Sequence, residues 1–110
     1  METKDAVLAL AALAHDSRLE IFRRLVQAGP AGIVAGELAA GLGIPPNTLS
    51  FHLKTLHHAG LVASRQSGRF VHYSANYAHM SGLLGFLTEN CCSGSACTPA
   101  SITATTRATS

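Results

Sequence analysis

Three cysteines stand close together near the end of this 110-residue sequence. Cys91, Cys92 and Cys97 are an odd number and fall within a short segment, which is not the pattern of a disulfide framework. A cluster of thiolates can bind a soft ion or act as a redox switch. A thiol enzyme, such as an oxyanion reductase, would need an anion-binding loop with an arginine nearby. Only Arg107 follows the cysteines, so the sequence favours an ion site or a switch over an enzyme, and no catalytic cofactor is expected.

A second set of side chains could contact nucleic acid. Leu49, Leu53 and Leu56 recur at helical spacing and predict a helix over 46–59 whose opposite face is polar. Short polar side chains at a helix start can reach base edges in a DNA major groove, and the free amides there attract phosphate. A lysine one turn later and a basic hairpin tip suit the DNA backbone. The predicted DNA-contacting residues are Pro46, Asn47, Thr48, Ser50, Phe51, His52 and Lys54 of the helix and Arg65, Gln66 and Arg69 of the hairpin.

The charges are unevenly distributed, although the net charge is only +2. There is no carboxylate between Glu37 and Glu89, and this stretch contains Lys54, Arg65 and Arg69. An acid-free and mildly basic region is expected to face a polyanion. The alternative is an ordinary solvated face on a protein of low charge.

The composition and the N-terminal segment limit the classes of protein to which this chain can belong. With 47% hydrophobic and 13% charged residues, the chain has the composition of a globular domain. The apolar stretch 6–14 does not follow a basic segment, as a secretory signal would, and it is too short to span a bilayer. We therefore expect a cytoplasmic protein that does not enter a membrane.

Helices and strands must position these side chains. The periodicity of the apolar residues predicts a mainly α protein with a small β-hairpin. The predicted helices are 3–14, 17–28, 34–42, 46–59 and 77–90, and the predicted strands are 61–66 and 70–75 around a Ser67-Gly68 turn. Two short helices joined by a tight glycine-containing turn and followed by a hairpin form a winged helix-turn-helix. We predict that residues 1–90 form this domain and that residues 91–110 form a flexible tail containing the cysteines.

Two helix ends carry local signals. Ser17 and Glu20 match a capping box at the start of the second helix, in which each side chain satisfies a free backbone amide. Gly60 is predicted to end the helix over 46–59, with Leu61 supplying the apolar contact beyond it.

Residues 42–62, which read LGIPPNTLSFHLKTLHHAGLV, resemble the recognition segment of the ArsR/SmtB family of metal- and metalloid-responsive repressors. Residues 14–21 and 69–73 resemble the second helix and the wing of that family. The resemblance implies a homodimer that binds an inverted-repeat operator, with the first and last helices at the dimer interface. Phe51 departs from the polar or basic residue that is frequent there. Prolines replace the usual polar residues at the helix start, so backbone amides rather than a side-chain cap would act there. His52 stands where the family commonly has histidine, which would pack or contact phosphate.

The positions at which members of the family bind their ions indicate which group of the family this sequence resembles. The third helix contains no cysteine, and the last helix offers only His79 and Glu89 to a zinc ion. A variant group of arsenic sensors carries a Cys-Cys pair and a further cysteine after the last helix, and this sequence is similar to that group. Trivalent arsenic takes three thiol ligands, whereas structural zinc usually takes four. The segment from Cys92 to Cys97 reaches about 17 Å at most when extended, and its Ser-Gly-Ser linker can fold back.

The resemblance therefore implies a repressor that releases double-stranded operator DNA when arsenite binds Cys91, Cys92 and Cys97. A redox-sensing repressor and a repressor for antimony, cadmium or lead are the alternatives that the three thiols leave open.

Overall fold

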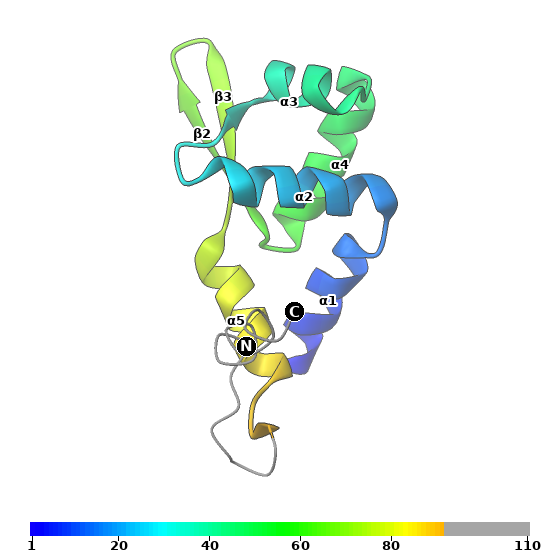
Figure 1. Ribbon diagram of the computed structural model, residues 1–110, viewed down its shortest axis with the longest axis vertical. Helices are drawn as coiled ribbons and strands as arrows, with labels where there is room; N and C mark the ends of the chain where they lie inside the picture. The colour runs from blue at the N-terminus through cyan, green and yellow to red at the C-terminus, as the bar shows by residue number, and fades with distance from the viewer. Residues whose placement is uncertain (92–110) are drawn as a thin grey trace, which may run out of the picture.

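The computed structural model describes residues 1–91 and has the predicted winged helix-turn-helix architecture. The elements are α1 (Thr3–Leu13), α2 (Asp16–Ala28), β1 (Ile33–Val34), α3 (Ala35–Leu42), α4 (Pro46–His58), β2 (Val62–Ser67), β3 (Phe70–Ala75) and α5 (Tyr77–Leu87). All predicted helices and strands are confirmed, although the last helix ends at Leu87 rather than at residue 90. Helices α1 and α5 contact each other at one end of the molecule, while α2, α3, α4 and the sheet occupy the other end (Figure 1). The predicted tail after Cys91 lies outside the described residues.

The sheet has three strands in the order β1-β3-β2, so the prediction of a two-stranded hairpin was incomplete. Ile33 and Val34 pair antiparallel with β3, but two residues are too short a segment to give a strand periodicity. Gly32 permits this approach, because its φ is +82° and a Cβ there would lie 2.5 Å from the carbonyl oxygen of Tyr73. The turn between β2 and β3 is Gly68-Arg69 rather than Ser67-Gly68, since Ser67 pairs with Phe70.

The core lies between α2, α3, α4 and the base of the sheet. Its largest fully buried side chains are Ile21, Leu25, Leu38, Leu49, Leu56 and Leu61. The predicted leucine stripe of α4 is confirmed, because its three leucines are all buried. The fully buried residues of helix α1 are alanines, at positions 6, 9 and 12, and three of its larger apolar side chains, Val7, Leu8 and Leu10, remain exposed. No helix within residues 1–91 is long and apolar enough to cross a membrane.

The two predicted helix-end signals have different outcomes. At the end of α4, Gly60 adopts a φ of +83°, and the amides of Gly60 and Leu61 donate to the carbonyls of His57 and Leu56. This is the predicted glycine cap, in the form of a Schellman motif. The capping box at Ser17 was wrong: α2 begins at Asp16, and the Nδ1 atom of His15 accepts the Ser17 amide at 3.1 Å. A histidine is a rare cap, which is why the usual sequence signal missed it.

The Tyr77 hydroxyl ties α5 to α2, where it lies within hydrogen-bond distance of the carbonyl oxygens of Leu25, at 3.4 Å, and Val26. The Tyr77 hydroxyl donates to the carbonyl oxygen of Val26 at 2.9 Å. A Tyr77→Phe variant leaves this carbonyl without its donor, so we expect the free energy of unfolding to fall by about 1 kcal/mol in urea denaturation. The matched control is Tyr73→Phe, because the Tyr73 hydroxyl makes no hydrogen bond within residues 1–91. Equal losses in the two variants would contradict this role for the Tyr77 hydroxyl.

Candidate nucleic-acid interface

The exposed face of α4 carries most of the side chains predicted to contact DNA. Asn47, Thr48, Ser50, Phe51 and Lys54 are all exposed, while the leucine stripe packs the opposite face into the core. The N-cap residue is Pro45, whose side chain makes no cap hydrogen bond, and Pro46 occupies the first turn. The amides of Asn47 and Thr48 therefore have no side-chain cap, which leaves the positive end of the helix open to an anion.

Phe51 is the largest apolar side chain on this face. It is 66% exposed, and its only ring contact within residues 1–91 is with His52, at a centroid distance of 6.1 Å. An exposed aromatic ring at this place can contact a thymine methyl group in the major groove. Phe51 therefore adds an apolar contact point to an otherwise polar face.

His52 differs from its neighbours, because it is 7% exposed and points away from the exposed face. Its ring contacts that of His15 at a centroid distance of 4.9 Å, and its Nδ1 has no hydrogen-bond partner among residues 1–91. Burial lowers the pKa of His52 from its ordinary value of 6.5, and the nearby His15 and Arg18 lower it further. Of the two roles that the resemblance left open, packing is the one that this buried position supports.

The lowered pKa of His52 gives a prediction for stability. Between the lower pKa of the folded chain and 6.5, the unfolded chain binds more protons at this residue. The contribution of His52 is therefore complete above 6.5 and is lost as the pH falls through that window. We expect the melting temperature to fall from about pH 7 to about pH 5, and a His52→Leu variant to have a flatter profile. The prediction is wrong if the two profiles are parallel.

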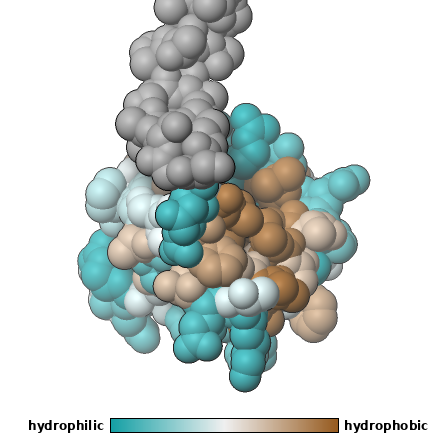
Figure 2. Space-filling view, turned by 90° about the horizontal axis from the view of Figure 1, so that it is seen from below, coloured by the Kyte–Doolittle hydropathy of each residue, from teal (hydrophilic) through white to brown (hydrophobic). Residues whose placement is uncertain are grey.

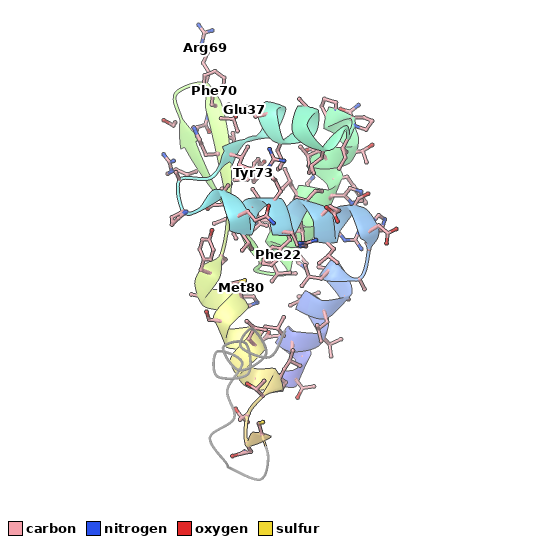
Figure 3. All side chains as sticks on the ribbon, in the orientation of Figure 1. Phe22, Glu37, Arg69, Phe70, Tyr73 and Met80 are labelled. Carbon is pink, nitrogen blue, oxygen red and sulfur yellow. The ribbon has the colours of Figure 1, made fainter. Side chains whose placement is uncertain are left out.

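The wing places its three predicted contact residues differently. The Arg65 guanidinium turns back toward the carbonyl oxygen of Ala31, at 3.4 Å, and the Gln66 amide donates across the turn to Gly68. Arg69 lies in the turn itself and extends away from the molecule, beside Phe70 (Figure 3). Arg69 is thus the wing cation best placed to meet DNA. Phe70 is 57% exposed and was not among the predicted contact residues.

A separate apolar face covers the end of the molecule formed by α1 and α5. Exposed large hydrophobic residues gather there, and Figure 2 shows this end as a brown area bordered by polar residues. They include Val7, Leu8 and Leu10 of α1 and Leu84 and Leu87 of α5. Beside them, an apolar groove of about 330 Å³ runs between α2 and α5, where Leu19, Phe22, Met80 and Leu84 are among its lining residues.

Of the three cysteines, the structure describes only Cys91. It lies one turn beyond the end of α5, where it is half-buried, and its amide donates to the carbonyl of Thr88 at 3.0 Å. Cys92 and Cys97 lie outside the described residues, so the predicted three-thiol site is not described as a unit.

Comparison with known proteins identifies the family. Over 81 residues, the chain is 35% identical to the arsenical resistance operon repressor of Bacillus subtilis, and the match covers 74% of this chain and 73% of that protein. The chain belongs to the ArsR family. A helix-turn-helix domain model also matches residues 13–65, which run from the end of α1 into β2. This match covers α4 and ends before the cysteines.

Other relatives agree with this assignment. The uncharacterized HTH-type transcriptional regulator YceK of B. subtilis is 41% identical over 58 residues, which are 53% of this chain and only 57% of that relative. Among solved structures, an ArsR-like transcriptional regulator from Rhodococcus sp. RHA1 has a TM-score of 0.69 at 30% identity, with 76% of each chain covered. A homodimeric winged helix-turn-helix domain from Mycobacterium bovis has the same fold, with a TM-score of 0.63 at 24% identity over 79% of this chain and 81% of that one.

Proposed function

We propose that this ArsR-family protein is a homodimeric repressor that binds inverted-repeat operator DNA and releases it when trivalent arsenic binds its cysteines. The observation that carries the DNA-binding part is the exposed polar face of α4, with Asn47, Thr48 and Ser50 at an uncapped helix start. These side chains would contact base edges, and Lys54 and Arg69 would contact phosphates on either side. Inserting this face into a major groove would bury Phe51, whose ring is otherwise left to water.

The apolar face of α1 and α5 supports the homodimer. A surface with several adjacent leucines is unfavourable in water, and burial in a partner of the same shape removes it. A two-fold dimer repeats its reading helix about the symmetry axis, so its DNA site is an inverted repeat with half-sites about one helical turn apart. The 35% identical relative from B. subtilis is an operon repressor, and the winged helix-turn-helix domain from M. bovis is a homodimer.

The proposed inducer is arsenite held by Cys91, Cys92 and Cys97. Soft thiolates suit trivalent arsenic, and the 35% identical B. subtilis relative is an arsenical resistance operon repressor. Cys91 follows the last turn of α5, so an ion bound there acts at the end of a helix of the proposed dimer interface. The ion lowers DNA affinity only if it binds more tightly to the conformation that holds DNA weakly.

The test is a DNA-binding titration with and without arsenite. A duplex selected by the purified protein from a random library is labelled, and its binding is followed by fluorescence anisotropy. Micromolar arsenite is expected to weaken binding by about 5- to 150-fold, the usual range of allosteric coupling. Release by cadmium, lead or antimonite but not by arsenite would contradict the choice of ion. Release by mild peroxide, with reversible loss of two protons in the mass spectrum, would instead support the redox repressor. Failure to select any DNA would overturn the proposal entirely.

A further inference from the structure

A cavity of about 200 Å³ that is open to solvent lies between α4 and the wing formed by β2 and β3. Its lining consists of Ser50, Leu53, Lys54 and His57 of α4, Ser64 of β2 and Tyr73 of β3. The four α4 residues are spaced at i, i+3, i+4 and i+7, so they share one face of the helix. Ser64 and Tyr73 are cross-strand partners, so both side chains lie on the same face of the sheet. Tyr73 lies between β3 and the helices in Figure 3. Side chains from three elements thus line one open cavity.

The polar groups around this cavity are all without partners inside the fold. Lys54, His57, Ser50, Ser64 and Tyr73 make no side-chain hydrogen bond or ion pair within residues 1–91. Each can donate a hydrogen bond, and no carboxylate lines the cavity. Five groups that can donate, one of them a cation, around a small space with no carboxylate form an environment that suits an oxyanion.

We propose that this cavity binds one DNA backbone phosphate in each protomer, at the border between the major groove and the strand that passes under the wing. This inference rests on the proposed DNA binding and assigns new roles to His57, Ser64 and Tyr73. Helix α4 would read the groove with Ser50 and its neighbours, and the next phosphate along the backbone would enter the space between α4 and the sheet. Lys54 supplies the charge, while the hydroxyls of Ser64 and Tyr73 fix the position of the phosphate oxygens.

The phosphate assignment has a distinct signature in salt dependence. A phosphate contact is independent of sequence, so it can be measured on a labelled duplex of random sequence of about 30 base pairs at about 50–200 mM KCl. Removing a cation from a phosphate reduces the slope of log K against log salt by about 0.9 per site, so Lys54→Gln should reduce the slope of a dimer by about 2. Tyr73→Phe and Ser64→Ala remove neutral donors, so each should weaken binding by about threefold to tenfold with the slope unchanged.

A double variant and a matched control make the test specific. If Lys54 and Tyr73 hold the same phosphate, the double variant Lys54→Gln/Tyr73→Phe should lose less affinity than the product of the two single losses. Tyr77→Phe is the control, because it also removes one hydroxyl but that hydroxyl bonds inside the fold. It should lower thermal stability and leave DNA affinity at the parent value, which is the reverse of the result expected for Tyr73→Phe.

The outcomes separate this inference from the proposed function. If the parent protein binds duplex DNA but Tyr73→Phe and Ser64→Ala bind equally well, the phosphate site is wrong and the repressor proposal stands. If the parent does not bind duplex DNA, both fall. Millimolar inorganic phosphate, followed by the NMR resonances of the His57 ring, tests a free anion as the ligand. No saturable shift is expected, because a lone ion brings none of the other contacts of DNA. Saturable binding that Tyr73→Phe abolishes would overturn the DNA assignment in favour of a free oxyanion.

Discussion

A Leu84→Glu variant is expected to be monomeric and to lose about 10²- to 10⁴-fold in affinity for the selected inverted-repeat DNA. Leu84 is 44% exposed on α5 and lines the apolar groove beside the face that α1 shares. In a two-fold dimer the substitution places two carboxylates in the apolar interface, and an unpaired buried charge costs several kcal/mol. A monomer then binds one half-site and loses the advantage of the linked second contact. Sedimentation velocity gives the oligomeric state, and anisotropy gives the affinity.

The control for this variant is Ala78→Glu. Residue 78 is an exposed position on the same helix, about 120° around its axis from residue 84, and the substitution adds the same charge. It should remain dimeric and bind DNA as the parent does. A dimeric Leu84→Glu protein with parent affinity would show that the α1 and α5 face is not the dimer interface. If the Leu84→Glu protein remains a dimer but loses DNA binding, the substitution acts on DNA binding without acting on dimerisation.

A Cys92→Ser variant is expected to bind operator DNA with parent affinity and to be released only at arsenite concentrations at least about 100-fold higher. Serine keeps the size of the side chain but does not provide a thiolate, so trivalent arsenic retains two of its three ligands. The variant loses one arsenic–sulfur bond and therefore binds arsenite more weakly. A higher arsenite concentration is then needed to release the DNA. The same anisotropy titration measures this for Cys91→Ser and Cys97→Ser, which should behave alike.

Two comparisons make the cysteine result decisive. Ser93→Ala, a neutral change beside Cys92, should respond to arsenite as the parent does. A methylated trivalent arsenical needs only two thiols, so at least one single serine variant should still respond to it. If Cys92→Ser is released at the same arsenite concentration as the parent, the assignment of Cys92 as a ligand is wrong. The DNA-binding proposal would be unaffected, because no predicted DNA contact involves the cysteines.

The order of elements could be predicted because the local signals are strong. The leucines of α4 recur at helical spacing, prolines open that helix, and Gly60 ends it with a left-handed residue. These are short-range effects, so the sequence carries them directly. β1 could not be predicted in this way. Ile33 and Val34 are a strand only because Gly32 allows their backbone to approach Tyr73 of β3, forty residues later in the chain.

The sequence by itself determined that the cysteines stand close together along the chain and that the middle of the chain has no carboxylates. It also determined that this middle region lies in a winged helix-turn-helix. These follow from residue identity, spacing and local backbone preference. Only the tertiary structure decided which side chains share a surface. It buried His52 against His15, turned Arg65 back to Ala31 and left Arg69 extending from the wing. It also brought Tyr73 and Ser64 opposite Lys54, because packing between α4 and the sheet, and not sequence distance, sets those contacts.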